Sequence, residues 1–199
     1  MSNIAIIVPT LNRIEFILRL ISFYQSSDAN ISLYIGDSTP NSNLNLIKKA
    51  TKINVNFQVH YFHFPKLNDG ETIYQLSLLV KEDFLAFTGD DDFLNPEALI
   101  ECSNFLKNNS NFNMAHGRAY QFKTKKNDML GKVAYFFPYM KFREVLDDTA
   151  YARILSLSKD YFVPEFSLSR TNEFREAKKP SIIISDRILR ELISSYSLI

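Results

Sequence analysis

The stretch that decides the fold lies at residues 84–96 and reads FLAFTGDDDFLNP. Four apolar residues predict a short buried strand, and three consecutive carboxylates follow it before Pro96, a residue favoured in the first turn of a helix. In open α/β sheets, ligands bind beyond the carboxyl ends of the strands. Because carboxylates suit Mg²⁺ or Mn²⁺, which enzymes hold together with substrate phosphates, the order strand, Asp-Asp-Asp, helix indicates a cation site for a phosphorylated ligand. A solvated acidic turn is the simpler alternative.

Strand-like and helix-like segments alternate on both sides of this stretch. The pattern predicts strands at 4–8, 31–35 and 55–64, and helices at 14–24, 44–50, 71–80 and 96–106. The first strand is a continuous β-branched and apolar run that ends at Pro9, as expected for a strand buried on both faces. Strands that alternate with helices favour an α/β fold of the Rossmann-like type, with a mostly parallel sheet flanked by helices.

The second half of the chain has a less regular pattern. Strand-like segments at 114–122 and 131–137 enclose the basic loop 123–128, which predicts a hairpin or an added antiparallel edge, with the loop as a candidate lid. Further on, the pattern predicts helices at 147–158 and 185–194 and an extended segment at 162–168. We interpret the aromatic run Tyr135 to Tyr139 as core or a partner surface in preference to the wall of a ligand site.

Composition limits the classes of protein that this chain can represent. The chain has 199 residues, of which 46% are hydrophobic and 14% aromatic, so residues 1–199 are read as a single globular domain. Its apolar ending leaves open that more protein follows. A net charge of +1 gives no case for nucleic-acid binding, and a single cysteine excludes an internal disulfide framework. With no signal peptide or membrane span recognised, we expect a cytoplasmic protein, with association at the inner face of a membrane left open.

Small polar or charged groups follow the ends of several predicted elements. Singly, each has an ordinary explanation as a turn residue or a helix cap, and for Asp186 the two readings are about even. Together they converge, because the carboxyl ends of parallel strands meet at one edge of a sheet and form one crevice there. The residues are Pro9, Thr10 and Arg13 after the first strand, Asp37 after the second, Asp90, Asp91 and Asp92 after the strand at 84–87, and Asp186 at the start of the last helix.

These motifs resemble a known family. With IIVPTLNR at 6–13, Asp37, the segment 84–99 and ISDR at 184–187, the chain is similar to the GT-A nucleotide-sugar glycosyltransferases, specifically glycosyltransferase family 2. The resemblance extends from residue 4 to roughly 192 and is strongest over 84–99. Three features depart from the family pattern: Gly89 stands where the family often has Asp, Ser185 where it has Glu, and Ile73-Tyr74 near the place of its Arg-Asn pair.

The resemblance implies a GT-A fold and a role for each of these residues. Pro9, Thr10, Arg13, Asp37 and Asp90 would bind the nucleotide, Asp91 and Asp92 would hold Mg²⁺ or Mn²⁺, and Asp186 would be the catalytic base. The metal assignment agrees with a second feature of the sequence. Because the chain lacks both G-x-G-x-x-G and G-x-x-x-x-G-K-[ST], no glycine-rich loop is present to bind a diphosphate, and a cation is needed to neutralise it.

The function expected from the resemblance is inverting, metal-dependent transfer of a sugar from a nucleoside-diphosphate donor, most simply UDP-linked, to a carbohydrate or lipid-linked acceptor. The alternative is a catalytically silent relative that binds nucleotide-sugar or serves as an interaction module, since Ser185 alters the base motif. A nucleotidylyltransferase is disfavoured because no glycine accompanies Asn12-Arg13. An EF-hand is excluded because Leu94 and Asn95 occupy positions that need a ligand and a glycine. The oligomeric state is left open.

Overall fold

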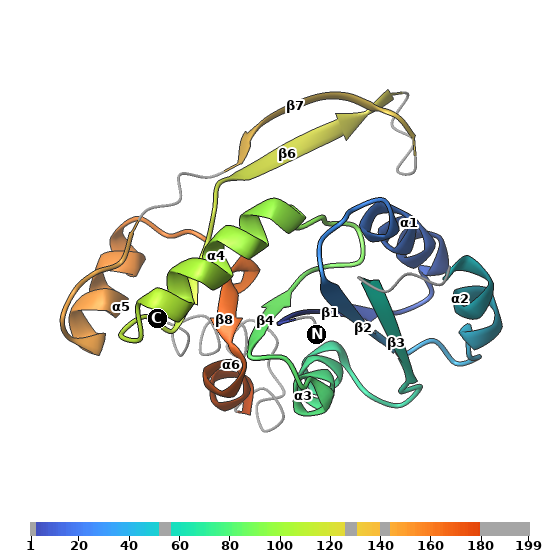
Figure 1. Ribbon diagram of the computed structural model, residues 1–199, viewed down its shortest axis with the longest axis horizontal. Coiled ribbons are helices and arrows are strands. Elements are labelled where there is room, and N and C mark those ends of the chain that lie inside the picture. Colours follow the sequence, from blue (N-terminus) through green and yellow to red (C-terminus); the bar gives the residue numbers. More distant parts are fainter. Residues whose placement is uncertain (1–2, 52–56, 126–130, 140–143, 180–199) are drawn as a thin grey trace.

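The computed structural model describes residues 3–51, 57–125, 131–139 and 144–179 (Figure 1). The helix expected at 185–194 and the candidate base Asp186 lie outside these ranges. None of the helices within them is long and apolar enough to cross a membrane.

The centre of the fold is a six-stranded sheet with the order β3-β2-β1-β4-β8-β5. Its parallel part consists of β1 (Ile4–Thr10), β2 (Ile31–Asp37), β3 (Phe57–His63) and β4 (Phe84–Phe87), and its antiparallel part of β8 (Leu168–Arg170) with β5 (Met114–Ala115) at the edge. Thr10 pairs with Asp37 at the carboxyl ends of β1 and β2, and Ile7 pairs with Phe87 at the end of β4. The register therefore brings the three strand ends that carry polar residues to one edge.

Helices cover both faces of this sheet (Figure 1). They are α1 (Ile14–Gln25), α2 (Leu44–Ala50), α3 (Asp69–Leu79), α4 (Pro96–Asn108), α5 (Ala150–Lys159) and α6 (Thr171–Lys178). Apolar side chains of α1, α2 and α4 pack with Ile6 and Val8 on one face, whereas those of α3 and α6 pack with Ala5 and Ile7 on the other. Alternate residues of β1 thus serve two cores, which explains why its sequence is apolar throughout.

The strands β6 (Ala119–Thr124) and β7 (Val133–Tyr139) pair with each other and form a separate antiparallel sheet. This hairpin extends over α4 toward α1 (Figure 1). Its contact with the body includes the ring of Phe122, whose centroid lies 6.2 Å from that of Phe93 in the loop after β4. The hairpin therefore faces the loop that contains the three aspartates.

The structure confirms the predicted α/β fold with a mostly parallel sheet and an antiparallel portion. The hairpin is also confirmed, although its first segment is interrupted at 116–118 between β5 and β6. The segment expected only to be extended contains a 3-10 turn (Pro164–Phe166) and then β8, which lies inside the main sheet, and α6 follows without having been predicted. Reading the aromatic run 135–139 as core is wrong, because every residue of β7 is exposed.

Candidate functional site

The loop after β4 forms the centre of the site. Thr88 continues the strand by donating its backbone N–H to the carbonyl of Ile7 at 3.1 Å, and the backbone N–H of Asp92 donates to the carbonyl of Gly89 at 3.4 Å. The chain thus turns within 89–92, before the side chain of Asn95 caps α4. Because a buried strand fixes the start of this loop and a capped helix fixes its end, the three aspartates are held at the carboxyl edge of the sheet.

Asp90 is directed into the protein and joins β4 to β1. Its side chain is almost fully buried and accepts a hydrogen bond of 2.7 Å from the Thr10 hydroxyl. The Arg13 guanidinium lies 3.0 Å from its other carboxylate oxygen. Burial raises the pKa of Asp90 above its usual value, and the Thr10 hydrogen bond and the charge of Arg13 oppose this rise without cancelling it. The predicted site residues Thr10, Arg13 and Asp90 therefore form one connected cluster.

Two arginines extend this cluster to Asp91. Arg13 donates to a carboxylate oxygen of Asp91 at 2.8 Å, and this hydrogen bond raises the pKa of Arg13. Arg19 donates to the backbone carbonyl of Asp91 at 3.3 Å, and its guanidinium lies over the rings of Phe16 and Phe93 at 4.9 and 5.0 Å. Sequence reasoning missed Arg19, although a basic residue inside the otherwise apolar helical run around it was a usable signal.

Asp91 and Asp92 direct carboxylate oxygens toward a common point beside Gly89. A Cβ atom at position 89 would lie 3.2 Å from Asp91 Oδ1 and 3.2 Å from Asp92 Oδ2. The pKa of Asp92 lies above its usual value because nearby protein partly removes the carboxylate from water, and because Asp91 and Asp90 add negative charge. A cation beside these oxygens would relieve this repulsion.

The carboxylates of Asp91 and Asp92 beside Gly89 supply only part of the oxygen ligands that Mg²⁺ or Mn²⁺ requires. Within the residues that the structure describes, no group of three or more His, Cys, Asp or Glu side chains is arranged to hold a metal ion. Enzymes usually hold Mg²⁺ with one or two carboxylates and complete the shell with substrate phosphates and water. Asp91 and Asp92 therefore fit a cation whose coordination a bound diphosphate completes.

Asp37 is fully buried at the end of β2, and its carboxylate accepts hydrogen bonds from three neighbouring groups. It accepts hydrogen bonds from the Thr39 backbone N–H at 2.9 Å, from the Asn43 side-chain amide at 2.8 Å and from the Tyr61 hydroxyl at 2.8 Å. Burial raises the pKa of Asp37, but these hydrogen bonds lower it by more, so that the pKa lies below its usual value. The carboxylate thus organises the loop after β2, and its contact with a nucleotide base stays a prediction.

We expect Asp37→Asn to destabilise the protein by about 2–3 kcal/mol at pH 7, because the amide presents an N–H group to buried donors. The pKa of an aspartate in the unfolded chain is about 3.9. An aspartate whose pKa is lower than this in the folded protein stabilises the fold at pH values above about 3.9, and this stabilisation is lost as the pH falls through the folded-state pKa. The difference in unfolding free energy between the two proteins should therefore shrink below about pH 4. Urea titrations between pH 3 and 7 measure it; a constant difference would contradict the ionised, hydrogen-bonded state of Asp37.

The loops after β1 and β2 are tied to one another. Pro9 pairs with Gly36 within the sheet, and the backbone N–H of Ser38 donates to the Thr10 carbonyl at 2.9 Å. Asn12 adopts a left-handed φ of 56°, and its N–H donates to the Thr39 hydroxyl at 2.9 Å. These contacts therefore hold the loop after β2, which begins at Asp37, against the loop after β1, which begins at Thr10.

Two adjoining cavities open between the aspartate loop and the hairpin. The larger, of about 850 Å³, lies between α4, the end of β4 and the hairpin, and the smaller, of about 370 Å³, lies against Asp91 and α1. Arg19 and Asp92 border both. The hydroxyl of Thr88, at the wall of the larger cavity, is buried without a hydrogen-bond partner among the described residues. Aromatic side chains contribute most of the apolar wall: Phe23, Phe93, Tyr120, Phe122, Phe136 and Phe166.

Comparisons with known proteins find similar solved structures, among them structures of S. aureus TarS. No protein-family model matches the chain, and no curated protein matches it. The crystal structure of residues 1–349 of S. aureus TarS superposes with a TM-score of 0.60 at 18% identity, over 100% of this chain and 55% of that one. The same protein in complex with UDP gives 0.57 at 17% identity, over 98% and 54%. In complex with UDP-GlcNAc it gives 0.55 at 17% identity, over 88% and 47%.

These similarities concern the fold. The chain spans about half the length of the TarS structures that it matches. At this level of identity the comparison establishes a shared GT-A-like fold and nothing about individual side chains. Roles of individual side chains have to be argued from the geometry of this chain.

Proposed function

We propose that this chain is the nucleotide-binding part of a glycosyltransferase that resembles family 2. It moves a sugar from a nucleoside-diphosphate donor, most simply UDP-linked, to a carbohydrate or lipid-linked acceptor on the cytoplasmic side of the cell, and inverts the anomeric centre. The observation that carries the proposal is the cluster of Thr10, Arg13 and Asp90 to Asp92 beside an open cavity. The likeness to a fold solved with UDP and UDP-GlcNAc supports the choice of donor.

In this proposal the cluster prepares the carboxylates for the donor. Thr10 and Arg13 fix Asp90, which is the residue expected to accept a hydrogen bond from the ribose. Asp91 and Asp92 would hold Mg²⁺ or Mn²⁺, which when bound stabilises the negative charge that develops on the departing diphosphate. Because Arg13 and Arg19 lie next to these carboxylates, they limit the repulsion among them and add positive charge near the phosphates.

The acceptor hydroxyl would lose its proton to Asp186, the residue in the place where the resembling family has its base. Attack on the face of the sugar opposite the leaving diphosphate is a direct displacement, and it inverts the configuration. The larger cavity offers room for sugar rings beside the aspartates, and its aromatic wall suits their apolar faces.

Release of UDP from a nucleotide-sugar tests the proposal and separates it from the silent alternative. In Mn²⁺ we expect UDP-linked donors to raise the melting temperature by about 5–10 °C at a hundredfold excess over the dissociation constant. We also expect slow hydrolysis of the donor without an acceptor, and neither effect in EDTA. Thermal stabilisation with no UDP release would favour the silent nucleotide-sugar-binding module. Neither stabilisation nor release with any nucleoside diphosphate or nucleotide-sugar would contradict both readings.

A further inference from the structure

Strand β7 is unusual because it is apolar in composition and yet exposed to solvent. It reads VAYFFPY at 133–139, and all seven of its residues are exposed. Phe136 is 69% exposed, and Tyr135 is 54% exposed. Apolar side chains of this size are usually buried, and a contiguous exposed group of them marks an interaction site.

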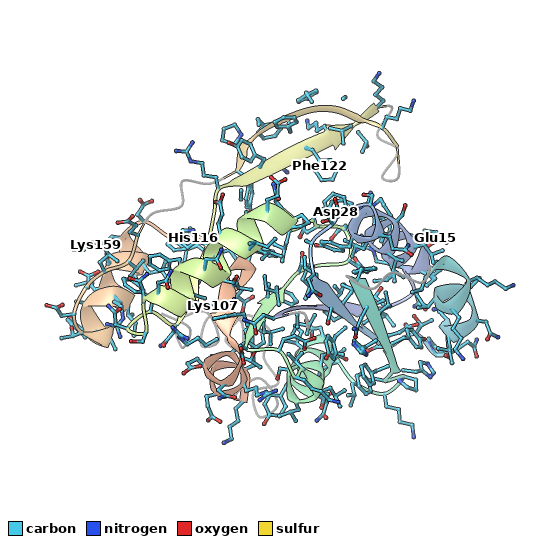
Figure 2. The ribbon with its side chains drawn as sticks, viewed as in Figure 1. Glu15, Asp28, Lys107, His116, Phe122 and Lys159 are labelled. Atoms are coloured by element: carbon cyan, nitrogen blue, oxygen red, sulfur yellow. The ribbon has the colours of Figure 1, made fainter. Side chains whose placement is uncertain are left out.

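The hairpin presents two different faces. Phe122 points toward the body (Figure 2), where it meets Phe93. Residues directly opposite each other in an antiparallel pair share a face, so Phe136, the partner of Phe122, faces the same way and lines the larger cavity. Tyr135 and Phe137 alternate with Phe136 and line neither cavity. They form the outer face, with their ring centroids 6.2 Å apart.

The hairpin also concentrates positive charge. Within 118–125 and 131–139, Arg118, Lys123, Lys125 and Lys132 are exposed, and no acidic residue occurs. None of the four forms an ion pair within the described part of the chain. Because the whole chain carries a net charge of only +1, the rest of the protein is net negative. The hairpin therefore combines an excess of positive charge with exposed aromatic rings.

These two properties together select one class of partner. A second copy of the same face would bring like charges together, which disfavours self-association. A purely anionic polymer would use the lysines but would leave the rings of Tyr135 and Phe137 without an apolar environment. A bilayer with anionic headgroups satisfies both, because aromatic rings favour the level of the headgroups and lysines are attracted to lipid phosphates.

We propose that the outer face of the β6–β7 hairpin docks on an anionic lipid bilayer. Tyr135 and Phe137 enter the headgroup region, and Lys125 and Lys132, which line neither cavity, contact the phosphates around them. The inner face of the hairpin remains over the cavity. This proposal is independent of the proposed enzymatic function, because its test needs neither a donor nor an acceptor.

Vesicle flotation of the 199-residue chain tests the proposal. We expect the protein to float with phosphatidylcholine vesicles that contain about one third phosphatidylglycerol, and not with phosphatidylcholine alone. The variant Lys125→Glu, Lys132→Glu should bind at least about twentyfold more weakly, since each lysine near an anionic surface contributes about fivefold. The double variant Tyr135→Ser, Phe137→Ser should lose about tenfold or more.

A charge-matched control distinguishes the hairpin from net charge. Lys48 and Lys49 are exposed on α2, so their replacement by Glu gives the same net charge away from the hairpin. This variant should bind nearly as well as the wild type, and circular dichroism melting checks that all variants fold. Equal loss in both lysine variants, or equal flotation with neutral and anionic vesicles, would overturn the proposal. A dimer that only the Tyr135→Ser, Phe137→Ser variant abolishes, without vesicle binding, would also overturn it and assign the face to self-association.

Discussion

Replacing Asp186 with asparagine is expected to lower sugar transfer by about two to four orders of magnitude, which is the usual contribution of a general base. The variant keeps the shape of the side chain but cannot accept the proton of the acceptor hydroxyl. Because the step concerns the acceptor, affinity for UDP and for the cation should stay nearly unchanged, and the loss should appear in kcat. The measurement is steady-state transfer once an acceptor is found, together with donor affinity.

The competing explanation for Asp186 is a helix cap. Asparagine caps a helix about as well as aspartate, so a purely structural role predicts near-normal turnover in this variant. Asp28→Asn is the matched control, because Asp28 is exposed in the loop between α1 and β2 and borders neither cavity. Near-normal transfer by Asp186→Asn would remove Asp186 from the mechanism and leave the rest of the site unaffected.

The second large effect is expected at the aspartate loop. The double variant Asp91→Asn, Asp92→Asn should lower metal-dependent donor hydrolysis and transfer by about a hundredfold or more, the size of effect seen when a group that stabilises transition-state charge is removed. Both carboxylates beside Gly89 lose their negative charge, and Arg13 keeps an ion pair only with Asp90. UDP release from a nucleotide-sugar donor in Mn²⁺ measures the loss.

A control with the same change in charge is available on the next helix. Glu97 and Glu101 are exposed on α4, and neither borders the cavities. Glu97→Gln, Glu101→Gln should therefore retain the wild-type rate. If both double variants lowered the rate equally, the aspartates would act only through overall charge. That result would contradict a specific cation site.

The parallel half of the fold was predictable because burial on both faces requires continuous apolar runs. Ile4–Thr10 has this property, Ile31–Asp37 has it apart from Ser32, and each ends in the polar residue expected to face the crevice. The short strand β8 was not predictable, since three residues carry no periodicity and its place beside β4 depends on contacts distant in the chain. Exposed aromatic residues in β7 were misread because an apolar strand normally lies in a core.

The candidate site was predictable as a list of polar residues at strand ends, but its internal connections were not. Nothing local in the sequence indicates that Tyr61 donates to Asp37, because the pairing depends on the register of β2 and β3. The same holds for the hydrogen bond of Thr10 to Asp90, whose partners are 80 residues apart. Such contacts decide which carboxylates are engaged within the protein and which are directed toward a ligand.

Calorimetric titration of UDP into the wild-type chain, in Mn²⁺ and in EDTA, tests most directly the claim that the aspartate loop binds a nucleoside diphosphate through a cation. We expect binding in Mn²⁺, no measurable binding in EDTA, and no gain from Mn²⁺ in the Asp91→Asn, Asp92→Asn variant. Equal affinity for UDP in Mn²⁺ and in EDTA, unchanged by both substitutions, would contradict that claim.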